Sequence, residues 1–511
     1  MNRSIPALCS VSMPLALCLS LGGSPKTAIG QTRFPADSVV LTSMRGLVAE
    51  GQVTGLVVGL LESDGTRRVL TAGSSGRAGV DLNGETIFEI GSITKTITGI
   101  LLADMVRTRE VSLGDPVATL LSPGSSVPAR NGKQISLLDL TTHHSGFPGQ
   151  IDLPQDSDNP WAAFTVASMY EWLSRFQPTR DPGAAFEYSN VGTGLLGHAL
   201  ALRAGKPYEA LITERVLTPL GLSSTSITLT PAMLARVARA HDAFGDSTSM
   251  WDIPAIAGAG ALRSTANDML TFAAGNLEAA SAVAPTGIHA SLKDALAPRR
   301  AIKNEKGKVG RDSVGFNWIL NASPASRRLI WHNGGTGGHS AVLILDPAGK
   351  KAVVVLTNTG DAHSVIQPLA FNLVDSSVAL PKPRLGPFVA IAYRTGGIAE
   401  AVARYRSAGS ANHRFNANET DLNRLGYWLL RKRQNVADAI AIFRLNVETY
   451  RDNPDVHDSL GEALAISGQM KEAHASFARA VALAEQQKSD DVGYYRKNLE
   501  RAAQALAQGV R

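Results

Sequence analysis

The sequence predicts an α+β fold in which one antiparallel sheet is assembled from both ends of a large domain, followed by a small all-α domain. Strand signals cluster near the two ends of the large domain, at 54–61, 68–72, 328–331, 340–346 and 352–357. The middle, 151–284, mixes helices and loops and has few strand signals. Strands that are distant in sequence but share a sheet imply a helical insert between them. From about residue 417 onward, helical periodicity dominates.

Length and composition are those of a globular protein with more than one domain. The chain has 511 residues, with 44% hydrophobic and 18% charged residues, which is normal for globular proteins. The formal net charge of +6 is small for this size. We interpret the one short basic run, 431–433, as a solvated helix face, so the sequence gives no sign of nucleic-acid binding.

The first thirty residues are expected to be an export signal. Met1–Arg3 is a short basic start, 5–21 is an apolar run, and Ala28–Gly30 fits a small-x-small cleavage pattern. The run is marginal for a membrane span, so an uncleaved anchor is the alternative. Both cysteines, Cys9 and Cys18, lie in this segment, so disulfide or thiol chemistry cannot explain a mature chain without it. We expect a periplasmic or secreted protein whose mature form has no transmembrane anchor.

The segment Phe88–Lys95 is the first candidate for chemistry. It is typical of a buried strand, a glycine turn and the start of a helix, which puts Ser92 near a helix N-terminus. Free backbone N–H groups and the helix dipole favour negative charge there. Lys95 is three residues further on and therefore shares a helix face with Ser92. A desolvated lysine can activate a serine hydroxyl, although Ser-x-x-Lys also occurs by chance.

A second candidate is Tyr188-Ser189-Asn190, on an irregular segment before the apolar, glycine-rich helix predicted at 191–202. A tyrosine phenol beside a lysine ammonium can relay a proton, and an asparagine amide can hold both the lysine and a substrate carbonyl. The alternative is a tyrosine packed in the core beside an asparagine turn.

The third candidate is the glycine-rich segment His332–His339, which opens onto a strand. Many glycines at a strand edge suggest that something approaches the backbone closely. This edge could supply one N–H of an oxyanion hole, with the other from Ser92. The alternative is a plain loop.

Together these segments resemble the serine β-lactamase and penicillin-binding superfamily, and within it the class C β-lactamase-like family of β-lactamases, esterases and D-stereospecific peptidases. The three motifs stand in the family's order, and the segments 135–148, 219–222 and 260–269 are also similar. The resemblance covers about 34–379. It implies a β-lactamase/transpeptidase-like α/β sandwich for a domain at 31–380, which needs no metal or cofactor.

The resemblance also implies catalytic roles. Ser92 would be the acylated nucleophile, and Lys95 and Tyr188 would share general-base and general-acid duty. Asn190 would orient Lys95 and the acyl group. The N–H groups of Ser92 and Gly335 would form the oxyanion hole.

Substrate contacts are implied at Gln150 and at His332, Asn333 and Gly334, where many class C β-lactamases have Lys-Thr-Gly. An unperturbed histidine titrates near pH ~6.5. We therefore expect carboxylate-bearing substrates to lose affinity, relative to neutral esters, as the pH rises from about 6 to 8. The pair His143-His144 could suggest a metal, but no third ligand stands at a suitable spacing, and we interpret it as a structural loop.

The end of the chain is expected to form a separate helical domain at 417–511, after a stiff proline-rich linker that starts at Pro381 and extends to 416. Four apolar residues recur 34 residues later: Ala439, Ala441, Phe443 and Val447 as Ala473, Ala475, Phe477 and Val481. With Leu460-Gly461, this resembles a tetratricopeptide repeat. The first copy has Gly426-Tyr427 where Leu-Gly is expected. Two copies and a closing helix are few for a free-standing array, and a plain helical bundle is the alternative.

Two functions remain open at this point. The first is an exported serine hydrolase that acts through an acyl-enzyme on β-lactam, ester or D-amino acid peptide substrates. The second is a catalytically weak sensor that binds a ligand and engages a protein partner through the tetratricopeptide-like domain. The presence of Ser92, Lys95, Tyr188 and Asn190 together favours the hydrolase.

Overall fold

The computed structural model describes residues 33–154, 157–303, 309–322, 327–409, 414–415 and 418–509. The predicted export signal at 1–30 lies outside this range. The chain divides into two compact units. The large unit comprises residues up to Val48 and Val53–Pro381, and the C-terminal unit comprises Ala49–Gln52 and Lys382–Arg511. No helix in the described part of the chain is long and apolar enough to cross a membrane.

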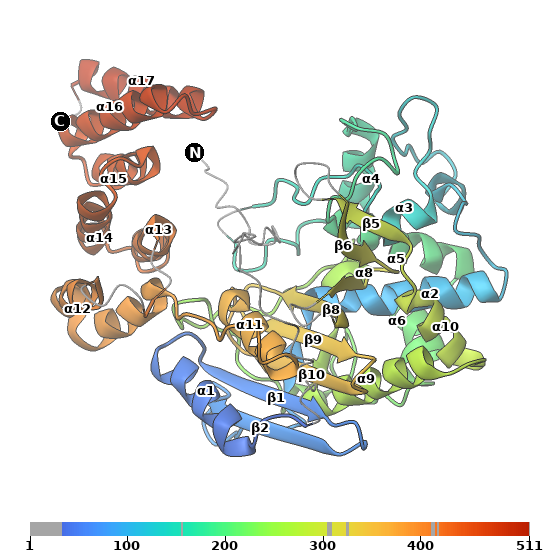
Figure 1. The fold of residues 1–511 in the computed structure, drawn as a ribbon. Coiled ribbons are helices and arrows are strands. Elements are labelled where there is room, and N and C mark those ends of the chain that lie inside the picture. The colour runs from blue at the N-terminus through green and yellow to red at the C-terminus, as the bar shows by residue number, and fades with distance from the viewer. Residues whose placement is uncertain are drawn as a thin grey trace, which may run out of the picture. The chain divides into compact units, whose positions relative to one another are not determined.

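The described part of the large unit is built on an eight-stranded antiparallel sheet in the order β2-β1-β10-β9-β8-β7-β6-β5 (Figure 1). The strands are β1 Gly55–Leu61, β2 Arg67–Gly73, β5 Arg300–Lys303, β6 Val309–Val314, β7 Ile319–Ala322, β8 Arg328–Gly335, β9 Ser340–Asp346 and β10 Lys351–Thr357. β1 pairs with β10, so strands from the two ends of the unit meet in one sheet. The predicted α+β arrangement is therefore confirmed.

Helices cover both faces of this sheet, and alternate residues of each strand enter different cores. In β1, Val57 and Leu61 pack in one core, which contains α2 (Thr94–Arg107) and α9 (Ala266–Ser281). Leu56, Val58 and Leu60 pack in the other core, which contains α1 (Asp37–Ala49) and α11 (His363–Val374). A strand that is apolar on both faces is buried along its whole length, as β1 is. The result is a three-layer sandwich.

The helices of the large unit are α1 Asp37–Ala49, α2 Thr94–Arg107, α3 Leu137–Thr141, α4 Val166–Arg175, α5 Asn190–Ala204, α6 Tyr208–Ile212, α7 Pro231–Leu234, α8 Ala257–Gly260, α9 Ala266–Ser281, α10 Gly287–Leu296 and α11 His363–Val374. Those from α2 to α10 lie between β2 and β5 in the chain and form the helical insert. A short second sheet pairs β3 Ile87–Glu89 with β4 Arg263–Thr265.

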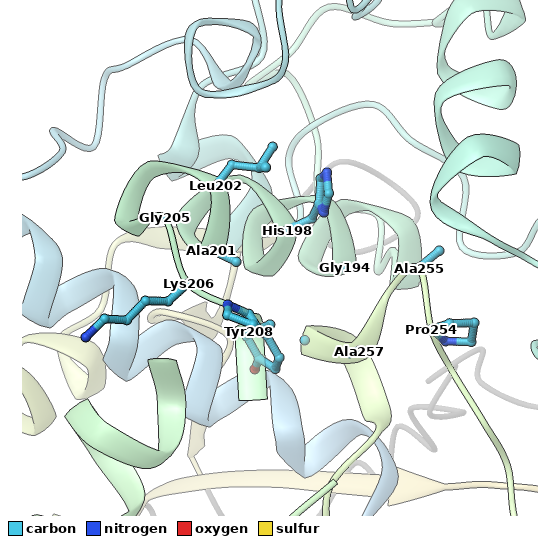
Figure 2. A pocket seen from close by; sticks show the side chains of 12 residues that line it. Gly194, His198, Ala201, Leu202, Gly205, Lys206, Tyr208, Pro254, Ala255 and Ala257 are labelled. Atoms are coloured by element: carbon cyan, nitrogen blue, oxygen red, sulfur yellow. The ribbon is translucent and has the colours of Figure 1, made fainter. Parts of the chain in front are cut away.

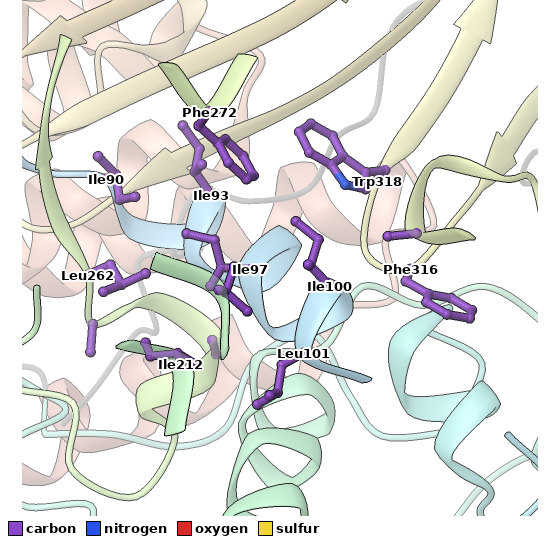
Figure 3. Close-up of a cluster of buried hydrophobic side chains, with 14 of the residues drawn as sticks. Ile90, Ile93, Ile97, Ile100, Leu101, Ile212, Leu262, Phe272, Phe316 and Trp318 are labelled. Carbon is purple, nitrogen blue, oxygen red and sulfur yellow. The ribbon is translucent and has the colours of Figure 1, made fainter. Parts of the chain in front are cut away.

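Helix α2 runs through the interior of the larger core. Ile97, Ile100 and Leu101 lie among side chains of other elements, including Leu262, Phe272 and Trp318 (Figure 3). Figure 3 labels the further core members Ile90, Ile93, Ile212 and Phe316. A helix that is apolar on most sides is a buried helix. Residues in its first turn, Lys95 among them, are therefore enclosed by protein rather than by solvent.

The C-terminal unit is helical: α12 Leu385–Gly409, α13 Glu419–Tyr427, α14 Val436–Thr449, α15 Pro454–Ile466, α16 Met470–Gln486 and α17 Val492–Ala507. The range predicted as linker, 381–416, is mostly occupied by α12, which bends at Gly397. Pro387 is the third residue of this helix, where the missing N–H would have had no helical partner. Pro387 therefore does not mark an extended segment.

The helix pairs α13–α14 and α15–α16 pack through equivalent contacts. A Cβ on Gly461 would lie 2.7 Å from the ring of Phe477, and a Cβ on Gly426 would lie 2.5 Å from the ring of Phe443. The contacts therefore make Leu425-Gly426 the counterpart of Leu460-Gly461. The 34-residue spacing had suggested Gly426-Tyr427 instead, and that alignment is wrong by one residue.

One additional residue in the first pair explains this shift. Gly426 and Phe443 are 17 residues apart, whereas Gly461 and Phe477 are 16 residues apart. The extra residue falls where the chain forms a π-helical turn, Trp428–Lys432. A π-helical turn takes up one inserted residue within a helix, so both pairs keep the same glycine-to-phenylalanine contact.

Candidate active site

The turn that leads into α2 presents Ser92 at the entrance of the helix. β3 ends at Glu89, and Gly91–Ile93 form a single 3₁₀ turn before α2 begins at Thr94. Gly91 has φ +48°, and a Cβ there would lie 2.6 Å from the Gly335 nitrogen, so this position requires glycine. Ser92 is half-buried in this turn, which stands directly before the helix.

Lys95 is fully buried one helical turn after Ser92. Its Nζ lies 2.9 Å from Ser92 Oγ and donates to Asn190 Oδ1 at 2.8 Å and to the Ala259 carbonyl at 2.7 Å. The amine is thus held by α5 and α8 as well as by its own helix. An amine at this distance can exchange a proton with the serine hydroxyl.

Tyr188 and Asn190 come from the start of α5. The Ser189 side chain caps this helix by accepting from Gly192 N, so Asn190 occupies its first turn and its amide reaches Lys95. The Tyr188 ring also lies beside the amine, with Lys95 Nζ 4.9 Å from the ring centre. The two motifs therefore meet at one lysine.

His143 lies under Tyr188, a role that the sequence did not reveal. Its ring stacks on the Tyr188 ring with centroids 4.5 Å apart. Its carbonyl accepts from Glu187 N at 2.8 Å and its Nδ1 from Ser189 N at 3.2 Å. His143 thus holds both neighbours of Tyr188. Burial and the nearby Lys95 lower the pKa of His143 well below its usual value, so the ring is neutral and Nε2 carries its proton.

His332 is also a buried, neutral histidine. Its Nδ1 lies 2.5 Å from the Asn333 carbonyl and must donate to it, which leaves a lone pair on Nε2. Burial, followed by the positive charge of Lys95, lowers the pKa of His332 to about 3. The expectation that His332 titrates near pH 6.5 is therefore wrong, because the sequence does not report that the side chain is only 2% exposed.

The two N–H groups proposed for the oxyanion hole belong to backbone segments in direct contact. A Cβ on Gly334 would lie 1.9 Å from the Ile90 carbonyl oxygen and 2.7 Å from Ser92 N. β7 pairs with β8 only up to Trp331, so among the described strands none covers this edge of β8 beyond it. Backbone groups at such an edge can meet a substrate.

Two further predicted substrate contacts, Asn333 and Gln150, differ in their surroundings. Side chains alternate along a strand, and Asn333 points to the face of α11, where its Nδ2 donates to Gln367 Oε1 at 2.8 Å. Gln150 is exposed on the loop whose Gly149 lies against the Tyr188 carbonyl. No hydrogen bond between Gln150 and another described site residue is present. The described residues also contain no cluster of three or more His, Cys, Asp or Glu side chains that could hold a metal.

A protein-family model described as Beta-lactamase matches residues 42–372. The chain belongs to the β-lactamase family. It is therefore a serine hydrolase of the β-lactamase and penicillin-binding superfamily, as the motif order indicated. The match ends before residue 382, so helices α12 to α17 lie outside the family domain.

Several characterised proteins are similar to this β-lactamase family member. A β-lactamase of Lysobacter lactamgenus is 26% identical over 373 residues, which cover 70% of this chain and 90% of that protein. The D-alanyl-D-alanine-carboxypeptidase/endopeptidase AmpH of Escherichia coli K12 is 29% identical over 310 residues, 59% of this chain and 79% of that protein. The crystal structure of a β-lactamase/D-alanine carboxypeptidase from Pseudomonas syringae superposes with a TM-score of 0.56 at 21% identity, covering 66% of this chain and 98% of the other. This likeness supports the β-lactamase fold.

A buried carboxylate organises the backbone around the active site of this family member. Glu89 Oε2 accepts from Thr336 Oγ1 at 2.7 Å and from His339 Nδ1 at 3.1 Å, and Oε1 accepts from Trp251 N at 2.7 Å. Burial by itself would raise the pKa of Glu89, but these hydrogen bonds and the charges of His339 and Arg263 hold the pKa below its usual value. A lone charged residue in an apolar strand was the only sequence signal for this role.

A separate cavity of about 410 Å³ lies between α5 and residues 254–258 (Figure 2). His198 and Tyr208 are among its lining residues. The Tyr208 hydroxyl hydrogen-bonds to Thr98 Oγ1 at 2.6 Å. None of the lining residues is Ser92, Lys95 or Tyr188, so this cavity is distinct from the serine site.

Proposed function

We propose that this protein hydrolyses esters, β-lactams or D-amino acid peptides through an acyl-enzyme on Ser92. The observation that carries the proposal is the contact of 2.9 Å between the fully buried Lys95 Nζ and Ser92 Oγ. A lysine that is removed from water and placed against a serine hydroxyl is suited to take its proton.

The reaction would proceed in two halves. In the first, the amine of Lys95, once it has given up a proton, takes the Ser92 proton while Oγ bonds to the substrate carbonyl carbon, and the carbonyl electrons move to its oxygen. The N–H groups of Ser92 and Gly335 would stabilise that oxyanion. The bond to the leaving group then breaks, and the proton passes to the leaving group through Lys95 and Tyr188. In the second half, water replaces the leaving group and frees Ser92 by the same steps.

We propose that substrates with an uncharged group beside His332 are favoured. A neutral imidazole attracts no carboxylate. The structural support is the burial of His332 and its Nδ1 bond to the Asn333 carbonyl. Neutral esters and amides fit this environment better than anionic cephalosporins do.

A hydrolysis screen with p-nitrophenyl esters, a chromogenic cephalosporin and D-amino acid peptides tests the function. We expect turnover of at least one class, and a loss of at least about 10³-fold in Ser92→Ala. A fluorophosphonate should add its mass to the wild type and not to Ser92→Ala. Ser38→Ala is the matched control, because Ser38 is exposed on α1. Labelling that persists in Ser92→Ala would refute the assignment.

We further propose that residues 1–30 direct export to the periplasm or medium, with cleavage near Gln31. N-terminal sequencing of the exported protein tests this, and a chain that keeps Met1 in the membrane fraction would contradict it.

We propose that residues 417–511 are a tetratricopeptide-like domain that binds a protein partner, while 31–380 carries the hydrolase. The support is the repeated glycine-to-phenylalanine contact in the two helix pairs. A chain that ends near Ala379 should keep its turnover of small esters. A folded but inactive fragment would mean that the C-terminal unit shapes the site, as a sensor function would require.

A further inference from the structure

His363, the first residue of α11, lies directly on the peptide group that joins Gly334 to Gly335. Its Nε2 is 2.9 Å from the Gly334 carbonyl oxygen. Its Cε1 is 2.6 Å from the point where a Cβ of Gly335 would stand. Because a carbonyl oxygen only accepts, Nε2 must carry the proton of this hydrogen bond.

The same peptide group carries the second N–H of the proposed oxyanion hole. A peptide is planar and trans, so the Gly334 carbonyl and the Gly335 N–H point in opposite directions. A Cβ on Gly91 would lie 2.6 Å from Gly335 N. The N–H therefore faces the Ser92 turn, while the carbonyl faces His363.

The contact with His363 matters because the Gly334–Gly335 peptide lies at the end of the β8–β9 ladder. Gly334 pairs with Ala341 and Gly335 with Ser340, and these are the last pairs of the β8–β9 ladder. The pairing with β9 holds this peptide from one side, and side-chain packing adds nothing to it because neither glycine has a side chain. A hydrogen bond to a peptide carbonyl also polarises the N–H of the same group and makes it a better donor.

We propose that His363 is a positioning residue of the oxyanion hole, which holds and polarises the Gly334–Gly335 peptide from the face of the sheet opposite Ser92. It acts through the backbone, without touching the substrate. The proposal rests on the proposed acyl-enzyme function and assigns that function a residue outside its three motifs.

The test compares two substitutions that separate the ring from its donor. His363→Phe keeps an aromatic ring and removes the N–H, whereas His363→Gln keeps an N–H donor and removes the ring. We expect His363→Phe to lower kcat for a neutral ester about 10-fold, less than the loss of a whole oxyanion donor, with KM changed less than twofold. A boronic acid that bonds to Ser92 and places an oxygen in the hole should lose affinity by the same factor. His363→Gln should recover most of both quantities.

Ser364→Ala is the matched control, because Ser364 is the next residue of α11 and is exposed. His363→Leu provides a second variant without a donor if His363→Phe does not fold, as judged by circular dichroism and the melting temperature. Unchanged kcat and boronate affinity in a folded variant without the donor would overturn the inference. So would an equal loss in His363→Gln, because that loss would be structural. If fluorophosphonate does not label the wild type, the proposed function fails instead, which distinguishes the two failures.

Discussion

The large unit and the C-terminal unit both use glycine to bring two elements close, but the neighbouring atoms differ. In the active site, a Cβ on Gly334 would meet the Ile90 carbonyl oxygen at 1.9 Å. In the C-terminal unit, a Cβ on Gly461 would meet the Phe477 ring at 2.7 Å. A ring can turn aside, whereas a backbone carbonyl moves only if its strand or turn moves. The position of the oxyanion edge therefore depends on backbone contact, and the helix pairs depend on side-chain packing.

The largest effect is expected for Gly334→Ala. The added methyl group must push β8 away from the Ser92 turn, which separates the two N–H groups of the proposed hole. We expect ester turnover to fall at least about 10²- to 10³-fold, with a loss of about 1–3 kcal/mol in the free energy of unfolding. Kinetics and chemical denaturation measure both.

Gly114→Ala is the control for that substitution. A Cβ on Gly114 meets no atom within 4 Å, so turnover and stability should stay within error of the wild type. If Gly334→Ala behaved like Gly114→Ala, the contact between backbones would not control the site.

The two units also differ in how they hold a buried carboxylate, Glu89 in the large unit and Asp421 in the C-terminal unit. Hydrogen bonds and nearby positive charge outweigh the burial of Glu89 and lower its pKa, whereas burial raises the pKa of Asp421 on α13 despite Arg384 nearby. Glu89→Gln leaves the buried guanidinium of Arg263 without this counter-charge, so we expect a loss of about 3 kcal/mol in the free energy of unfolding at pH 7.

The two carboxylates should also respond to pH with opposite signs. The stability from Glu89 is fully present above the unfolded pKa of about 4.3 and is lost as the pH falls below it through the lowered folded pKa. The stability from protonated Asp421 is present below the unfolded pKa of about 3.9 and is lost as the pH rises through the raised folded pKa. Melting temperatures of the wild type, Glu89→Gln and Asp421→Asn from pH 3 to 7 measure these slopes. Parallel curves for the wild type and Glu89→Gln would contradict the assignment.

A smaller effect is expected for the pH dependence of substrate affinity, which involves the neutral imidazole of His332. Because the pKa of His332 is about 3, the ratio of KM for a cephalosporin to KM for a neutral ester should stay constant from pH 6 to 8. A wild-type ratio that rises across this range would show that His332 titrates there.

The smallest effect on activity is expected for Gly461→Ala. The Phe477 ring has to shift, which should cost the C-terminal unit about 1–2 kcal/mol. Small-ester turnover should remain unchanged, because every residue of the proposed mechanism belongs to the large unit. Protease sensitivity of the C-terminal unit and ester kinetics check the two statements, and a parallel loss of turnover would link the units.

Much of the fold could be predicted because the central strands are continuous apolar runs. β9 has the predicted bounds, and β1 and β10 each differ by one residue. β5 to β7 were not predicted, since segments such as Arg300–Lys303 show neither an apolar run nor clear alternation. The linker and the first repeat were misplaced because a proline in a first helical turn and a π-helical turn leave no distinct local signal.

The candidate site likewise contains residues that local sequence could predict and residues that it could not. Ser92 and Lys95 could be paired because three residues on a helix fix their geometry. His143, Glu89 and His363 could not be assigned, because their roles come from contacts with residues distant in the chain. The pKa of His332 depends on enclosure by several elements, which no local pattern encodes.

The pairing of β1 with β10 also has a kinetic consequence. Gly59 lies opposite Val354, so the first hairpin of the large unit has to wait for almost the whole unit to be synthesised before its inner edge is covered. Contacts between such distant residues slow folding, and an open strand edge is prone to aggregate while it waits. The helix pairs at the end of the chain join neighbouring segments and form without this delay. The large unit should therefore fold slowly and late, and a nascent chain released before residue 357 should remain unfolded.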